Sequence, residues 1–138
     1  MTVQIPDSHK DLLEKPIYAV ISTVMANGQP QSSVVWCSFD GTHIWLNTAR
    51  SRMKDKNLAA RPMATVLVMD PQNPYRYLEA RCTVAEVTEA GAVDHISQLS
   101  REYTGKFPYY GGYAPAERAQ KETRVIYKLA PNKVVAYG

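Results

Sequence analysis

Two tight-turn signals in the first third of the chain constrain the fold more than any other feature. Asn27-Gly28 follows the β-branched run Ile17–Ala26, and Asp40-Gly41 follows the run Pro30–Phe39. Such dipeptides favour the two-residue turns of β-hairpins, because Asn, Asp and Gly tolerate the positive φ angles that these turns need. With Thr42–Asn47 as the next β-like run, the sequence predicts three consecutive antiparallel strands.

The rest of the chain predicts further strands and a few short helices. Further strands are expected at Met63–Met69, Tyr75–Val87 and Arg124–Lys128, the last broken at Pro131 and resumed at Val134–Tyr137. Helices are expected near Leu12–Leu13, from Ser51 to about Ala60, over Thr88–Tyr103 with Thr88 as its cap, and over Ala116–Lys121. About six strands with a hairpin meander indicate a mainly β (α+β) protein built as a closed or half-closed antiparallel barrel. No Gly-rich dinucleotide motif follows a strand, which argues against a Rossmann fold.

Length and composition indicate one domain spanning residues 1–138, because 138 residues with 45% hydrophobic side chains suffice for one core. No apolar run approaches the roughly 18 residues of a membrane span. The segment Met1–Lys15 is polar and acidic rather than a secretory signal, so a cytoplasmic location is expected and no membrane partner.

Metal and nucleic-acid sites are not expected. Cys37 and Cys82 lack the spacing of a zinc or redox pair, and the three histidines are scattered. The net charge of +3 is too small to predict nucleic-acid binding by itself.

The positive charges gather instead in one segment. Five basic residues fall within twelve positions, against the single acid Asp55: Arg50, Arg52, Lys54, Lys56 and Arg61. Asn47 and Thr48 end the third strand, and Ser51, Arg52 and Lys54 are expected on the first helical turn. There, free N–H groups, the helix dipole, an Arg fork and hydroxyls suit a phosphate dianion. A solvated basic helix face without a ligand fits the same pattern, and the pattern alone leaves both interpretations open.

Resemblance to a known family adds to this pattern. The run WLNTARSRMKDKNLAARP resembles the phosphate-binding segment of the pyridoxamine 5′-phosphate oxidase-like superfamily of split β-barrel flavoproteins. More narrowly, it is similar to the branch of deazaflavin (coenzyme F420)-dependent reductases. The matching residues are Asn47, Thr48, Arg52, Lys54, Asn57, Leu58 and Pro62. Four more motifs match in order, at Asn27–Trp36, Asp70–Glu79, Leu99–Gly105 and Arg124–Pro131, so the resemblance covers nearly the whole chain.

The resemblance implies a six-stranded split β-barrel with a few short flanking helices, forming a homodimer with the cofactor at the subunit interface. It implies an oxidoreductase that uses coenzyme F420, with FMN as the alternative, to transfer hydride to a small conjugated organic acceptor. The cofactor itself carries that chemistry, and no catalytic side chain stands out. The expected cofactor-binding residues are Gln31, Ser32, Ser33, Val34, Val35, Trp36, Asn47, Thr48, Ser51, Arg52, Lys54, Tyr75 and Tyr77. The extra charges of Arg50, Lys56 and Arg61 would suit the longer anionic tail of the deazaflavin.

Two departures limit the resemblance. Cys82 stands where the family usually has a glycine, which leaves the local strand geometry open. Met53 replaces a basic residue of the oxidase branch, and the substrate-phosphate arginines of that branch are missing. True pyridoxamine phosphate oxidase activity is therefore not expected. The competing hypothesis is a flavin- or haem-binding module without turnover, in which Gly105–Ala116 would cover the ring.

Overall fold

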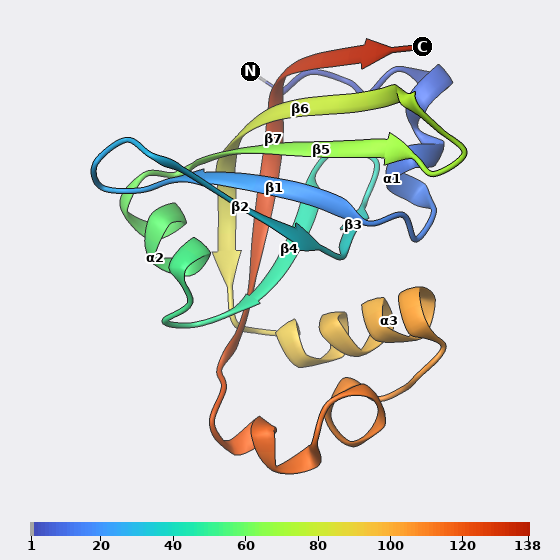
Figure 1. The fold of residues 1–138 in the computed structure, drawn as a ribbon. Coiled ribbons are helices and arrows are strands. Elements are labelled where there is room, and N and C mark those ends of the chain that lie inside the picture. Colours follow the sequence, from blue (N-terminus) through green and yellow to red (C-terminus); the bar gives the residue numbers. More distant parts are fainter. Residues whose placement is uncertain (1) are drawn as a thin grey trace.

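The computed structural model describes residues 2–138, which form one curled antiparallel sheet with short helices around it (Figure 1). The sheet has seven strands, one more than expected. The strand order across the sheet is β2-β1-β5-β6-β7-β4-β3. The strands are β1 Ala19–Val24, β2 Pro30–Val35, β3 Cys37–Phe39, β4 Ile44–Ala49, β5 Met63–Asp70, β6 Asn73–Thr88 and β7 Arg124–Tyr137. The predicted mainly β split-barrel fold is confirmed.

The barrel closes through the chain at Trp36. The run expected as one strand, Pro30–Phe39, is divided there: β2 pairs with β1, whereas β3 pairs with β4. These two strands are the opposite edges of the sheet, yet one residue joins them, so the sheet must curl until its edges meet. No ladder hydrogen-bonds the edges to each other among the described residues, which makes the barrel split.

The two longest strands, β6 and β7, pair along most of their length and carry irregularities that bend them. Contrary to expectation, β7 runs unbroken through Pro131. The register shifts at this point, because Arg81 pairs with Lys133 while Cys82 pairs with Pro131. The irregularity accommodates a proline that has no N–H to give to the ladder. It forms with Cys82 at the position where the resemblance led us to expect a glycine.

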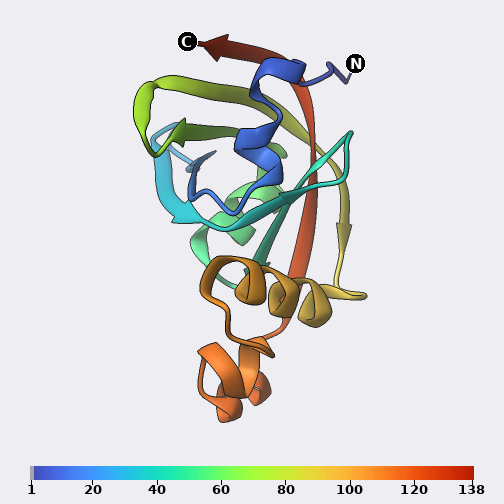
Figure 2. The same ribbon diagram turned by 90° about the vertical axis from the view of Figure 1, so that its right-hand side faces the viewer.

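The helices sit at the ends of the barrel (Figures 1 and 2). The short turns η1 Asp7–His9 and α1 Asp11–Glu14 lie at one end, and α3 Ala92–Thr104, η2 Tyr109–Tyr113 and η3 Ala116–Gln120 lie at the other. Between them, α2 Met53–Ala60 packs against β1 and β4. No helix within residues 2–138 combines the length and apolar content needed to cross a membrane.

The helix α3 begins later than the sequence predicts. Thr88 ends β6, and its Oγ1 accepts the N–H of Ala90 at 3.1 Å in a local turn rather than capping the helix. The helix starts at Ala92, directly after Gly91, whose φ of 76° reverses the chain. The apolar face of α3 was predicted correctly at Ile96 and Leu99, but Val93 is exposed.

Two hydrophobic cores follow from this arrangement. The main one fills the barrel and includes Ile21, Leu46, Val66, Leu78 and Leu129. The smaller one lies between α3 and η2, where Ile96, Leu99, Tyr109 and Ala114 pack with Trp36, Tyr103 and Tyr110. Trp36 therefore ties the barrel seam to the helical end of the molecule.

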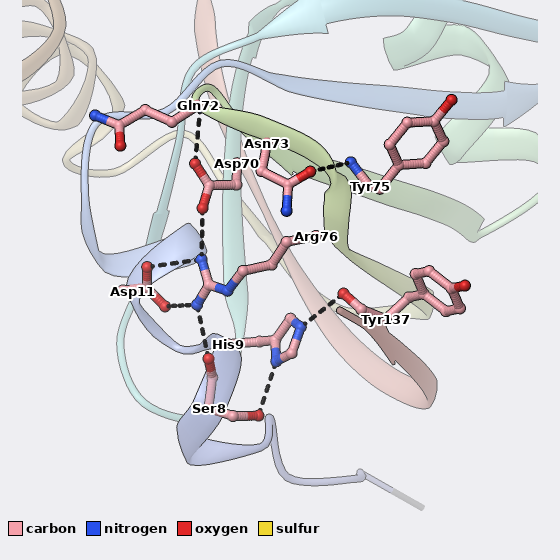
Figure 3. Close-up of polar contacts among 9 residues, drawn as sticks. All are labelled: Ser8, His9, Asp11, Asp70, Gln72, Asn73, Tyr75, Arg76 and Tyr137. Carbon is pink, nitrogen blue, oxygen red and sulfur yellow. Dashed lines mark hydrogen bonds and ion pairs between the residues drawn. The ribbon is translucent and has the colours of Figure 1, made fainter.

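A polar network fastens the N-terminal segment to the end of the barrel opposite α3 (Figure 3). Arg76 of β6 donates from Nη2 to Asp11 Oδ1 at 2.6 Å and from Nη1 to Asp70 Oδ2 at 3.1 Å. The His9 ring donates from Nε2 to the carbonyl of Tyr137 at 3.0 Å. The N-terminal segment is thus linked both to the β5–β6 turn, through Arg76 and Asp70, and to the end of β7.

Candidate functional site

The junction between β4 and α2 is held by one buried carboxylate, that of Asp55. Its Oδ2 accepts the Ser51 N–H at 3.0 Å, and its Oδ1 accepts Arg50 Nη1 at 3.0 Å and the Tyr127 hydroxyl at 2.5 Å. Although burial alone would raise the pKa of Asp55, the bonds from Tyr127, Ser51 and Arg50 and the charge of Arg50 hold it below the ordinary value.

This carboxylate explains why α2 begins at Met53 rather than at Ser51. Ser51 adopts a left-handed φ of 76°, which no helical residue has. Arg52 occupies the N-cap with an extended backbone and no side-chain cap. The expectation that Ser51 and Arg52 lie on the first helical turn is wrong, although Lys54 does lie there.

Beside this junction lies a pocket of about 320 Å³. It opens between the barrel seam, the start of α2 and the η2 loop. Six of the residues expected from the sequence line it: Val34, Val35, Trp36, Asn47, Arg52 and Lys54. The remaining lining residues are Tyr18, Ile96, Tyr109, Tyr113 and Arg124.

One end of the pocket is cationic, formed by Arg52, Lys54 and Arg124. Lys54 Nζ donates to Ser33 Oγ at 3.2 Å. The pKa of Lys54 is lowered by burial and then by the neighbouring charges of Arg52 and Arg124. The cationic end therefore carries more positive charge than the nearby acidic side chain neutralises. Such an excess of positive charge favours the binding of an anion.

Arg124 is the charged site residue that sequence reasoning missed. It is buried at the start of β7, and its Nη1 makes no hydrogen bond within residues 2–138, although it lies 3.5 Å from Glu122 Oε1. Its guanidinium also lies 5.3 Å from the centre of the Tyr109 ring, within cation–π range. The sequence offered one signal, an arginine as the first residue of an otherwise buried strand. It lies in the motif Arg124–Pro131, which was used only as evidence for the fold.

Asn47 holds the Arg124 side chain in place through a hydrogen bond. Its Oδ1 accepts Arg124 Nε at 2.9 Å, while its Nδ2 donates to the Ala92 carbonyl at 2.8 Å and to His95 Nδ1 at 3.1 Å. His95 therefore carries its proton on Nε2, which lies 2.9 Å from Ser38 Oγ. Burial and then the charge of Arg124 lower the pKa of His95 to about 4. The neutral ring, Asn47 and Arg124 form one continuous chain of bonds.

The other end of the pocket is aromatic. Trp36 stacks on Tyr103 with ring centres 5.6 Å apart, and Tyr113 meets Trp36 edge-on at 5.2 Å. Tyr103 is fixed because its hydroxyl lies 3.0 Å from the Ile17 carbonyl and 3.1 Å from that of Cys37. Tyr18 completes this wall from β1's leading end, packed 5.7 Å from Tyr103.

Several expected residues lie outside the pocket lining. Thr48 is fully buried, with its Oγ1 unpaired within the described chain, and Ser51 is exposed beside the junction. On β2, Gln31 accepts a bond from Thr23 and Ser32 bonds Ser22, whereas Ser33 reaches the pocket through Lys54.

Tyr75 and Tyr77 lie on β6, on a different face of the barrel. They line another hollow, with Leu67, Met69 and Val135, rather than the pocket. Within one chain they are not brought to the cationic end.

The additional positive charges are mostly committed elsewhere. Arg50 pairs with Glu89 and Asp55, and Arg61 donates to the Val24 carbonyl and to Asn57. Lys56 is exposed on α2. The expectation that these three charges await a longer anionic tail is not supported for Arg50 and Arg61.

Comparison with known proteins agrees with this architecture. Residues 5–137 match the profile of the pyridoxamine 5′-phosphate oxidase family. The chain belongs to this family. No curated protein matches the chain.

Solved structures share the fold. The chain is 32% identical to an F420 reductase, with 95% of this chain and 98% of that one covered and a TM-score of 0.81. A conserved hypothetical protein from Mycobacterium tuberculosis is 21% identical over 99% of this chain and 86% of that one, with a TM-score of 0.74. HutZ, the heme storage protein from Vibrio cholerae, is 12% identical over 99% and 96%, with a TM-score of 0.68. The last two likenesses show the fold alone.

Proposed function

We propose that this protein is an oxidoreductase that binds coenzyme F420 in the pocket and passes hydride to a small conjugated organic acceptor. The observation that carries the proposal is the cationic end formed by Arg52, Lys54 and Arg124. The 32% identity to an F420 reductase over nearly both full chains supports the choice of cofactor.

The donors at the cationic end fit a phosphate. Arg124 Nη1 is buried without a hydrogen bond among the described residues, and Lys54 spends one bond on Ser33. A phosphate has enough acceptor oxygens to receive all three side chains in charge-assisted hydrogen bonds. Two guanidinium forks and one ammonium would hold the phosphate and fix the direction in which the rest of the cofactor extends.

The bound cofactor supplies the hydride chemistry, and the protein has to orient the ring and exclude water. Val34, Val35 and Trp36 of the seam would lie along the ring, as expected for the family. Trp36 is well suited because it is stacked on Tyr103, which is itself bonded to the barrel backbone. No side chain is needed as a catalytic acid or base.

FMN is the alternative cofactor, since it shares the ribityl phosphate with the deazaflavin. The pocket's cations serve both equally, and Arg50 and Arg61 are engaged in other contacts. The preference for coenzyme F420 therefore rests on family resemblance and on the similar F420 reductase rather than on the extra charges.

A flavin- or haem-binding module without turnover is the competing function, and the fold shared with the heme storage protein HutZ keeps it in view. The two functions differ in whether a substrate can approach the ring. Tyr113 of the η2 loop lines the pocket while remaining about half exposed, so the pocket mouth beside it is open. This opening favours the enzyme.

A homodimer completes the proposal. An apolar face of β5, β6 and β7 exposes Met63, Met69, Tyr75 and Tyr137, with Tyr77 stacked 5.5 Å from Tyr137. Two neighbouring hollows of about 590 and 700 Å³ lie on this face and share Glu79 and Arg81. A second copy of the chain would bury these side chains, and it would bring Tyr75 and Tyr77 into the interface assigned to them from the sequence.

The test is a side-by-side titration of purified apoprotein with coenzyme F420, FMN and haem, followed by an assay for oxidation of reduced F420 with added quinone-like acceptors. The proposal predicts that coenzyme F420 binds most tightly and that the reduced form is turned over. Preferential binding of haem, or tight F420 binding without any turnover across acceptors, would support the module instead.

A further inference from the structure

Glu122 is the acid at the cationic end of the pocket, and it lies two residues before the start of β7. Its Oε2 accepts Arg52 Nη2 at 2.8 Å, and its Oε1 lies 3.5 Å from Arg124 Nη1. Burial alone would raise the pKa of Glu122, but bonds from Tyr110 and Arg52 and the charges of Arg52 and Arg124 lower it. The carboxylate is therefore ionised at neutral pH.

The position of Arg52 depends on this carboxylate. The Arg52 side chain is 43% exposed and makes no other side-chain hydrogen bond or ion pair within residues 2–138. A long, exposed arginine left without a partner samples many rotamers in solvent. Of the three cations, Arg52 is thus the one whose direction needs an external anchor, whereas Arg124 is held by Asn47 and Lys54 by Ser33.

The same carboxylate also anchors the aromatic wall. Tyr110 of η2 donates its hydroxyl to Glu122 Oε1 at 2.7 Å, and burial followed by this bond raises the pKa of Tyr110 to about 12. Tyr110 packs edge-on against Tyr109 at 4.9 Å, and Tyr109 lines the pocket. One side chain therefore contacts both the cationic end and the loop that forms the aromatic end.

We propose that Glu122 is a positioning residue that aims Arg52 into the pocket and fastens the η2 loop to the cationic end through Tyr110. The inference rests on the proposed function only for the identity of the anion, since both contacts exist in the protein without a ligand. The negative charge of Glu122 and its role in positioning Arg52 predict opposite effects on anion binding. As a mere counter-ion, Glu122 would weaken anion binding; as the anchor of Arg52, it strengthens it.

The experiment compares Glu122→Gln, Tyr110→Phe, Arg52→Ala and the Glu122→Gln/Arg52→Ala double variant with wild type. Glu117→Gln is the matched control, because it removes an equal charge from an exposed site on the neighbouring η3. Three quantities are measured: the affinity for FMN and coenzyme F420, the order of the Arg52 Nε–H vector by ¹⁵N NMR without ligand, and hydrogen exchange of the Gly111 and Ala114 amides, which bond within η2.

The proposal predicts that Glu122→Gln weakens cofactor binding about three- to tenfold despite the added positive charge. It predicts little further loss, less than about twofold, when Arg52 is already alanine. In the free protein, Glu122→Gln disorders Arg52, and both Glu122→Gln and Tyr110→Phe accelerate exchange in η2, while Glu117→Gln does neither.

Tighter binding in Glu122→Gln, an equal loss in the Arg52→Ala background, or an equally ordered Arg52 would overturn the inference. A wild-type protein that binds neither cofactor would contradict the proposed function instead. In that case the NMR and exchange measurements still decide the role of Glu122, because they are made without ligand.

Discussion

At the scale of single residues, the site is organised by two buried side chains. Arg124 and Asn47 are buried, and they meet because antiparallel pairing places the ends of β4 and β7 together. A sequence shows Asn47 next to Thr48 and Arg124 in another motif, but not that the Asn47 amide bonds Arg124. The charge pattern within one segment therefore predicted Arg52 and Lys54. Arg124 could be predicted only from the register between β4 and β7.

The burial of His95 beside the charge of Arg124 predicts a pH dependence of stability. Burial and then the charge of Arg124 lower the pKa of His95 from its ordinary value of 6.5 to about 4 in the folded chain, so folding favours the neutral ring. Its contribution is fully present above pH 6.5 and is lost as the pH falls from 6.5 towards 4. We expect this group to cost about 2 kcal/mol of unfolding free energy between pH 7 and pH 4.5.

Urea unfolding of wild type and His95→Gln at both pH values measures this contribution. The variant lacks the titrating ring, so it should lose about 2 kcal/mol less than wild type over the same interval. Equal losses in the two proteins would show that His95 is not held neutral by its surroundings.

At the scale of elements, hairpins and strand periods were predictable, whereas junctions were not. Asn27-Gly28 and Asp40-Gly41 determine local chain reversals, and these lie where the sequence places them. The expected two-residue turns are wrong, because residues 25–29 and 40–43 form longer loops in which only the glycines adopt a positive φ. The start of α2 depends instead on Asp55, which reaches back to the Ser51 N–H and across to Tyr127 of β7. Because one of these contacts is remote in sequence, propensity alone put the helix start two residues early.

The junction between β4 and α2 predicts that two substitutions change the free energy of unfolding differently. Asp55→Asn leaves fewer acceptors for Ser51, Arg50 and Tyr127, and should lower the unfolding free energy by about 1–3 kcal/mol, the usual cost of unsatisfied buried partners. Ser51→Gly relieves a left-handed φ of 76° and removes no side-chain hydrogen bond of the described structure, so stability should be unchanged or slightly higher. Thermal and urea unfolding check both.

Cofactor affinity also distinguishes Asp55→Asn from Ser51→Gly. We expect it to fall in Asp55→Asn, because the loop that presents Arg52 loosens, and to persist in Ser51→Gly, because Ser51 does not line the pocket. A large loss in Ser51→Gly with normal stability would instead assign the Ser51 hydroxyl to the phosphate.

At the scale of the whole molecule, the sequence predicted the barrel but not how it closes. The closing residue is Trp36, where one run of β-forming residues changes partner from β1 to β4. The sequence cannot show such a change, because the β-forming residues continue without a break on both sides of Trp36. The same turn at the seam brings Val34, Val35 and Trp36 against the pocket.

The exposed face of β5, β6 and β7 predicts the oligomeric state. Light scattering should give twice the mass of one 15.5 kDa chain for wild type, and one chain mass for Tyr75→Glu, which puts a charge on this face. Val93→Glu changes another exposed apolar residue, on α3 and away from this face, and should remain dimeric. A monomeric wild type at micromolar concentration would contradict the dimer.

If the cationic end of the pocket binds the phosphate of the cofactor, then the dissociation constant of coenzyme F420 depends on Arg52 and Lys54. We predict that Arg52→Ala and Lys54→Ala each weaken binding by on the order of 1.5–3 kcal/mol, or about 10- to 150-fold. Lys56→Ala, which removes the same charge from an exposed position of α2, should bind as wild type does. Wild-type affinity in both Arg52→Ala and Lys54→Ala, or a loss in Lys56→Ala as large as theirs, would contradict the account.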